Sequence, residues 1–287
     1  MMEEAGIKDF WNTHPCGEWV VDSQFAQEAE RFFTDYDAYR YRVEGHILKC
    51  LDGIDWRGKD VLEIGLGQGA DSEQLIRRGA RWSGLDLTPE AAQRVRTRMA
   101  LHKLPFGDVR VGSILEPPYA PASFDAIYSH GVLHHVPDIQ RASGEIAKLL
   151  RPGGELIIML YARWSWHYLY STYIYSRAVQ AAAYLCGRHS GDVLGGGYLE
   201  VIRRYGLWRY LRMRNFIHHN TDGPECPYSG VYDLTRVRRD FPHFQITRAY
   251  KRYMPPVPVP FLGLRRPPWE SALGFNLWVH LRPHQVL

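Results

Sequence analysis

The sequence predicts an α/β fold with a doubly wound, seven-stranded and mostly parallel sheet. Two observations lead to this fold class. Short apolar runs alternate with helical stretches over the first half of the chain, an order typical of a parallel sheet covered by helices on both faces. A chain of 287 residues with 45% hydrophobic content also suffices for one sizeable core with an insertion.

The expected elements follow in order. Residues 1–57 are helical and aromatic in character. Between residues 162 and about 232 lies more chain than a crossover needs, so we expect a helical insertion after the fifth strand, on the ligand side of the sheet. Helices are expected between the first five strands, and the strands are expected near residues 60–65, 80–86, 108–112, 124–129, 155–161, 244–252 and 275–282.

A glycine-dense turn directly follows the first strand. Gly65, Gly67 and Gly69 occupy alternate positions there, and glycine, which has no Cβ, lets the main chain approach a ligand closely. The next residues read as the opening of a helix whose free N–H groups face the same point. The turn therefore predicts a binding site, with a ligand-free tight turn as the alternative.

An acidic residue ends the second strand about twenty residues later. Asp86 stands where dinucleotide folds carry a ribose-binding carboxylate. Thr88, Pro89 and Glu90 already supply the cap and first turn of the following helix. Asp86 is thus free to bind a nucleoside.

The pattern acid-x-Gly-x-Gly-x-Gly, from Glu63 to Gly69, resembles the first motif of class I S-adenosylmethionine (SAM)-dependent methyltransferases. Residues 123–136 resemble the fourth strand and its loop in that family, and residues 149–156 resemble its turn into the fifth strand. Within the family the chain is most similar to the ubiquinone/menaquinone-biosynthesis-like methyltransferases. The last two strands resemble the antiparallel hairpin that closes the sheet of this Rossmann-like fold.

The resemblance implies SAM as cofactor and S-adenosylhomocysteine as product. It divides the chain into an N-terminal helical cap (1–57), a SAM-binding core (58–161), a helical lid or acceptor-site insertion (162–232) and the last core strands (233–287). Glu63 would orient the methionyl amino group and Asp86 would hold the ribose. The other residues expected at the cofactor are Gly65, Gly67, Gly69, Leu87, Ile114, Ser129 and His130.

Two features are specific to this chain. Where the family often has an acid after the third strand, to meet the adenine amino group, this sequence has Ser113, whose hydroxyl can accept that hydrogen bond. The N-terminal residues 10–17 resemble a lead-in of those family members whose N-terminal helices close over the cofactor. Arg40 and Tyr41 lie in the same segment, where the forked guanidinium could contact the methionyl carboxylate.

Methyl transfer relies mainly on proximity and orientation, but a hydroxyl or amine acceptor also requires a base. His134 and His135 follow the fourth strand at the expected cleft mouth, and His14 is a further candidate. The alternative is that the Leu-His-His run is structural, with one imidazole packing beside the cofactor.

We therefore expect methyl transfer to a small organic acceptor. The Trp and Tyr residues between 161 and 175 favour an aromatic or apolar acceptor, although they could equally serve packing. Two alternatives stay open: a SAM-using cyclase or lyase, and an idle SAM-binding scaffold. An NAD(P)-dependent enzyme is a remote further alternative.

Charge, cysteine content and hydropathy limit the classes of partner that we expect. The net charge of +4 is spread through the chain, which argues against nucleic acid. The four cysteines form no C-x-x-C pair, so neither a metal site nor a disulfide framework is expected. The sequence has no leader-like N-terminus and no apolar run long enough for a membrane span. We expect a cytoplasmic protein, with the insertion as a possible homodimer contact.

Overall fold

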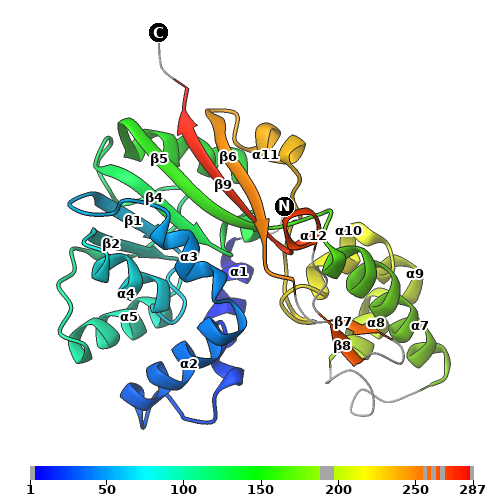
Figure 1. The fold of residues 1–287 in the computed structure, drawn as a ribbon. Coiled ribbons are helices and arrows are strands. Elements are labelled where there is room, and N and C mark those ends of the chain that lie inside the picture. The colour runs from blue at the N-terminus through cyan, green and yellow to red at the C-terminus, as the bar shows by residue number, and fades with distance from the viewer. Residues whose placement is uncertain (1–3, 188–196, 255–256, 260–262, 266–268, 285–287) are drawn as a thin grey trace.

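The computed structural model describes residues 4–187, 197–254, 257–259, 263–265 and 269–284, and Figure 1 shows their arrangement. A seven-stranded sheet runs through the molecule in the order β3-β2-β1-β4-β5-β9-β6. Its strands are β1 Asp60–Ile64, β2 Arg81–Asp86, β3 Val109–Val111, β4 Phe124–His130, β5 Leu150–Tyr161, β6 Phe244–Arg252 and β9 Asn276–Pro283. A separate hairpin pairs β7 Val257–Val259 with β8 Gly263–Arg265.

The first five strands are parallel, and β9 pairs antiparallel with both β5 and β6. The predicted doubly wound, mostly parallel sheet is confirmed. Strand order reverses between β1 and β4, and ligands of such sheets bind at the carboxyl ends of the strands beside this point.

Helices cover both faces of the sheet because its strands are apolar on both sides. On one face α3, α4 and α5 pack over Val61, Trp82 and Trp278, and on the other α6 and α11 pack over Leu62 and Ile158. The covering helices are α3 His46–Asp52, α4 Ala70–Arg77, α5 Pro89–Leu101, α6 Ile139–Leu149 and α11 Leu234–Asp240, and the short helices η2 Leu133–His135 and α12 Glu270–Leu273 lie in loops.

Side chains fix where three of these helices begin. The Thr88 hydroxyl accepts from the Ala91 N–H at 3.4 Å at the start of α5, which also has proline in its first turn. Asp138 and Asp233 cap α6 and α11 in the same manner. These caps satisfy N–H groups that have no partner within the helix.

The N-terminal segment forms α1 Glu4–Thr13, the short helix η1 Glu18–Val20 and α2 Ala29–Val43. Phe32 and Phe33 of α2 are fully buried. Buried pairing also ties α2 to the core, because Arg98 of α5 bonds both Asp37 and Glu73. The predicted N-terminal helices are thus present and packed on the core.

The predicted insertion is helical, and Figure 1 shows α7 to α10 gathered in a lobe beside the sheet. Its helices are η3 His167–Ser176, α7 Arg177–Leu185, α8 Tyr198–Tyr205, α9 Leu207–Tyr210 and α10 Met213–His219. The insertion has a small hydrophobic core, which includes Ile202, Tyr210 and Phe216. The insertion leaves β5 at Tyr161 and returns beside it, where the Tyr232 N–H donates to the Tyr161 carbonyl at 2.7 Å.

Candidate active site

A cavity of about 300 Å³ opens at the carboxyl ends of the parallel strands, where α1 and α2 meet the sheet. Among the predicted cofactor residues, those that line it are Arg40, Glu63, Gly65, Gly67, Asp86, Leu87, Ile114 and His130, and the predicted catalytic residue His135 lines it too. A volume of this size lies within the range of small-molecule sites.

The three glycines of the loop have three different environments. All have positive φ, from +51° to +79°. A Cβ at Gly65 would lie 2.2 Å from the Val132 side chain, and one at Gly69 would meet Val95 at 3.0 Å. A Cβ at Gly67 would meet no atom within 4 Å and would project into open space at the cavity wall. Only at Gly67 does the missing side chain leave room for a ligand.

The Asp86 carboxylate is held in a fixed orientation at the cavity wall. Its Oδ2 accepts from the Leu66 N–H at 2.7 Å, and Oδ1 accepts from the Thr88 N–H and hydroxyl at 2.8 Å. Burial raises the pKa of this carboxyl against the effect of these hydrogen bonds. A carboxylate has about four lone-pair sites and three donors bond it here, so room remains for about one further donor such as a ribose hydroxyl.

The apolar end of the cavity is lined by Leu87 and Ile114, as predicted for an adenine site. The predicted partner Ser113 does not line it, because its hydroxyl donates in a short hydrogen bond to the Glu4 carboxylate of α1. Glu4 itself lines the cavity. An acid therefore does stand at this end of the site, but it comes from the N-terminal helix rather than from the strand.

Arg40 reaches the opposite end of the cavity but is engaged in a buried network. Its Nε and Nη2 bond the two oxygens of Asp71 at 3.2 and 2.9 Å, and its Nη1 lies 3.6 Å from Glu44. Burial opposes ionisation of Asp71, but Arg40 and other neighbours, among them the Tyr128 hydroxyl, together outweigh it and lower the pKa of the carboxyl. Tyr41 donates to the same carboxylate at 3.4 Å and does not line the cavity.

Two titratable groups of this end are shifted toward their neutral forms. Burial, together with the charge of Asp71, raises the pKa of Glu63 to about 8, and the Trp82 indole donates to its carboxyl at 2.8 Å. Burial and the charge of Arg40 lower the pKa of His130 to about 3. The His130 Nε2 is buried without a hydrogen-bond partner among the described residues, and both side chains line the cavity.

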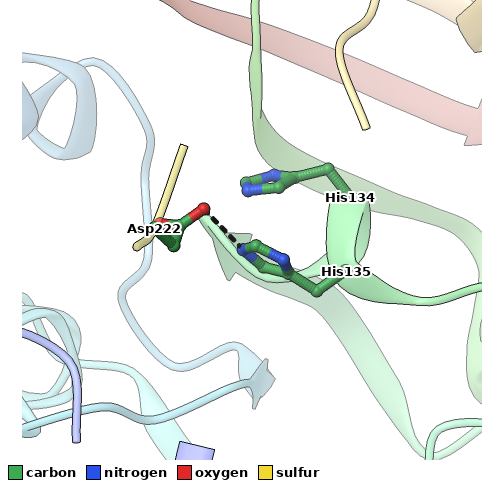
Figure 2. Close-up of side chains that lie close together, drawn as sticks. All are labelled: His134, His135 and Asp222. Carbon is green, nitrogen blue, oxygen red and sulfur yellow. Dashed lines mark ion pairs between the residues drawn. The ribbon is translucent and has the colours of Figure 1, made fainter. Parts of the chain in front are cut away.

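At a second polar end of the cavity, side chains of η2 and of the insertion meet. Nδ1 of His135 donates to the Tyr228 carbonyl at 2.7 Å, and its Nε2 lies 3.5 Å from Oδ2 of Asp222 (Figure 2). Tyr161 donates to the other oxygen of Asp222 at 2.7 Å. Since a carbonyl can only accept, the proton of a neutral His135 is on Nδ1, and its Nε2 is an acceptor facing another acceptor.

Besides Ser113 and Tyr41, four more of the predicted site residues lie outside the cavity wall. His134 is fully buried behind His135, with its ring 3.9 Å from that of Tyr161, and burial lowers its pKa well below the usual range. The Ser129 hydroxyl donates to the Ile64 carbonyl at 2.9 Å. His14 is exposed and stacks on Phe10, and Gly69 caps α4.

The sequence analysis missed Glu4, Asp71 and Asp222. Asp71 could have been found, because it is an acid in the first turn of the helix that follows the glycine loop. Asp222 lies 87 residues after His135 in a segment without a motif, and nothing in its neighbours distinguishes it from a turn residue. The aromatic residues from Trp164 to Tyr175, considered for an acceptor pocket, do not line the cavity; Tyr161 does.

Comparison with known proteins agrees with the glycine loop and the sheet. The model of a methyltransferase domain family matches residues 62–158. A ubiquinone biosynthesis O-methyltransferase of Alkalilimnicola ehrlichii is 32% identical over 200 residues, which cover 66% of this chain and 73% of that protein. The chain belongs to the class I SAM-dependent methyltransferases.

Other relatives match this methyltransferase over shorter lengths. A demethylmenaquinone methyltransferase of Tropheryma whipplei is 28% identical over 152 residues, and the match spans 49% of this chain and 62% of that protein. A ubiquinone biosynthesis O-methyltransferase of Xanthomonas euvesicatoria is 37% identical over 109 residues, 37% of this chain and 44% of that protein. The chain thus spans less than two thirds of the length of these two relatives.

Solved structures share the fold of this methyltransferase at low sequence identity. The PH0226 protein of Pyrococcus horikoshii superposes with a TM-score of 0.51 at 14% identity, over 86% of this chain and 91% of that one. A structure solved for the conversion of a disulfide bond into a thioacetal group during echinomycin biosynthesis has a TM-score of 0.50 at 16% identity, over 84% and 82% of the two chains.

Family membership gives the enzyme SAM as its cofactor. The cavity fits this cofactor, since Gly67 leaves open space at its wall and Asp86 retains acceptor capacity there. Among the described residues no helix is both long and apolar enough to cross a bilayer.

Proposed function

We propose that this enzyme transfers the methyl group of SAM to an oxygen of a small organic acceptor. The observation that supports this proposal most directly is the second polar end of the cavity. There His135 Nε2 and Asp222 Oδ2, which have no hydrogen-bond partner among the described residues, face the same space. The O-methyltransferases among the relatives support an oxygen acceptor.

The cofactor occupies the cavity from its apolar end to Arg40 in this proposal. Asp86 accepts from a ribose hydroxyl, and Leu87 and Ile114 enclose the adenine. Glu4 accepts from the adenine amino group, since its carboxylate is the acid beside Ile114. Glu63 and His130 meet the methionyl ammonium and carboxylate, and Gly65 and Gly67 leave space for the backbone approach.

When bound, SAM supplies a methyl group on a positively charged sulfur, which a nucleophile can displace in line. The protein must then hold the acceptor oxygen, exclude water and polarise or remove the hydroxyl proton. His135 Nε2 and Asp222 Oδ2 are the groups placed for that proton. Tyr161 and the Tyr228 carbonyl orient them, each through a hydrogen bond of 2.7 Å.

The insertion completes this acceptor end, because Asp222 comes from it. We propose that residues 162–232 act as a lid and acceptor-binding unit on a SAM-binding core of residues 58–161, with residues 1–57 as a cap and residues 233–287 as the last core strands. Glu4 and Arg40 are partly buried and line the cavity wall, which supports the cap role.

The test is a product analysis with methyl-labelled SAM and a panel of phenols and aliphatic alcohols, each paired with the corresponding amine. We expect S-adenosylhomocysteine and methyl ethers from the hydroxyl series. Methylthioadenosine as product would identify a lyase or cyclase, and transfer to the amines alone would contradict an oxygen acceptor.

A Tyr161→Phe variant tests the acceptor end. Loss of the hydroxyl frees Asp222, so we expect kcat to fall about tenfold or more, as for one lost hydrogen bond to a charged group, with unchanged SAM affinity. Tyr175→Phe, an exposed tyrosine of the insertion outside the cavity, is the matched control. Equal activity of both variants would remove Tyr161 from the mechanism.

A further inference from the structure

We propose that His134, His135 and Asp222 form a binding site for one divalent transition-metal ion. The site would hold the ion at the second polar end of the cavity and present it to an acceptor oxygen. This chemical role rests on the proposed function, whereas metal binding itself can be measured without it.

The geometry brings one ligand atom from each of the three residues together. These atoms all lie within 4.8 Å of one another, and Figure 2 shows both imidazoles turned toward the Asp222 carboxylate. His134 and His135 are neighbours on η2, after β4, and Asp222 follows α10 of the insertion. A metal ion between them needs ligand contacts of about 2.0–2.2 Å, so small side-chain rotations complete the triangle.

The same atoms are buried without hydrogen-bond partners in the described part of the chain, although His135 Nε2 approaches Asp222 Oδ2 to 3.5 Å. Both ring nitrogens of His134, Nε2 of His135 and Oδ2 of Asp222 have no hydrogen-bond partner among the described residues. His134 is fully buried and His135 is 4% exposed. Leaving a buried polar atom unpaired is destabilising, and a cation would satisfy an acceptor on each of the three side chains.

Surrounding hydrogen bonds hold the ligands in this arrangement. The Tyr228 carbonyl fixes His135 through Nδ1, and the Tyr161 hydroxyl fixes Asp222 through Oδ1, which leaves Nε2 and Oδ2 directed at the site. The Gly230 N–H also donates to the His134 carbonyl at 2.9 Å and ties the insertion to η2. Metal-binding histidines are commonly oriented by such carbonyl contacts.

The donor set selects the kind of ion. Two imidazoles and one carboxylate suit Zn²⁺, Fe²⁺, Co²⁺ or Mn²⁺ better than Mg²⁺ or Ca²⁺, which prefer oxygen. Three protein ligands leave at least one position open. Because His135 and Asp222 line the cavity and His134 lies behind them, the open position faces the cavity, where an acceptor hydroxyl could bind as a ligand with a lowered pKa. With the ion bound, the lone pairs of His135 Nε2 and Asp222 Oδ2 are occupied, so the ion replaces them in activating the hydroxyl. The proton leaves to bulk water as the acceptor binds, before the methyl transfer from which water is excluded.

Cobalt provides a spectroscopic test on the whole chain. Protein freed of metal with a chelator is titrated with Co²⁺, followed by visible absorption and calorimetry. We expect one ion per chain, with absorption bands that Zn²⁺ abolishes. X-ray absorption of the Zn²⁺-loaded wild type should show scattering from two imidazoles. No saturable binding, or a first shell without imidazole, would overturn the site whatever the behaviour of variants.

Variants locate the ion. Asp222→Asn and His135→Gln should each weaken Co²⁺ binding by more than about 100-fold, beyond the 10- to 100-fold effect typical of residues that only orient a ligand. His243→Gln, which removes an exposed imidazole before β6 at the other edge of the sheet, should bind normally. Retained stoichiometric binding in Asp222→Asn and His135→Gln would reject the assignment.

Two further readouts keep the two proposals apart. Affinity for S-adenosylhomocysteine should be unchanged in folded Asp222→Asn, which shows an intact cofactor end. If Co²⁺ binds as expected but no hydroxyl acceptor is methylated with or without metal, the proposed function fails and the metal site stands. If ethers form equally in chelator and no metal binds, the metal site fails and the proposed function stands.

Discussion

The difference between Gly65 and Gly67 offers the sharpest test of the glycine loop. Both residues have positive φ, +79° and +51°, so alanine at either position carries a similar backbone penalty of about 1–2 kcal/mol. Only at Gly65 would the new methyl group collide with protein, 2.2 Å from Val132. At Gly67 it would enter the space assigned to the cofactor.

The free energies of unfolding should separate accordingly. Gly67→Ala should lose about 1–2 kcal/mol, the backbone penalty alone. Gly65→Ala should lose a further 1–3 kcal/mol or so, the usual range for overpacking. Thermal unfolding of the ligand-free variants, at about 2–4 °C per kcal/mol in a protein of this size class, can resolve this difference. Val132→Ala in the Gly65→Ala background should restore part of the loss.

Cofactor affinity should show the opposite order. Gly67→Ala should bind S-adenosylhomocysteine at least about tenfold more weakly in calorimetry, which corresponds to 1.4 kcal/mol, although it is the more stable variant. Gly65→Ala with Val132→Ala should retain more affinity. Wild-type affinity in Gly67→Ala would refute the reasoning, because the space beside Gly67 would then not be where the cofactor lies.

Three more predictions concern the cofactor and the insertion. Asp86→Ala should weaken S-adenosylhomocysteine binding by about 1.5–3 kcal/mol, the value of hydrogen bonds to a charged group; unchanged affinity in calorimetry of the folded variant would reject the ribose role. Glu63 has a pKa of about 8 in the ligand-free protein and should lose its proton when the methionyl ammonium binds beside it. The affinity for S-adenosylhomocysteine should therefore rise with pH up to about 8 and then level off. Glu63→Gln, measured in parallel, should lack this rise. Hydrogen exchange over residues 162–230 should slow when S-adenosylhomocysteine and an acceptor mimic bind, more than in the central strands, and exchange indifferent to both ligands would argue against a lid.

The fold was predictable because its signals are local. The strands at residues 60–65, 80–86 and 124–129 are short apolar runs bounded by turns, and the structure has strands at these places. The fifth strand begins earlier than predicted, at Leu150, because its first residue already pairs with Phe124 before Pro152 and the two following glycines bulge out. Local sequence does not show such a cross-strand pairing.

The candidate site was predictable on the sheet side, and away from the sheet the prediction reached the cavity wall with Arg40 of α2. Asp86 and the glycine loop follow strands directly, so strand order alone places them at one edge. Glu4 and Asp222 reach the cavity through the packing of α1 and of the insertion, which depends on contacts far apart in the chain. Ser113 lies after the third strand, as expected. Its hydroxyl is nevertheless bonded to Glu4, a contact that the local sequence does not show.

The position of β9 between β5 and β6 has a consequence for synthesis of the chain. Asn276, where β9 begins, follows Tyr161, the end of β5, by 115 residues, and the sheet edge of β5 carries the buried apolar residues Leu156, Ile158 and Leu160. Synthesis proceeds at about 5–20 residues per second. The edge of β5 therefore stays unpaired for roughly 6–23 s before the partner strand β9 has been made. An unpaired apolar edge of this kind invites association with other chains, so the nascent enzyme is most exposed to aggregation while residues 162–275 are being made.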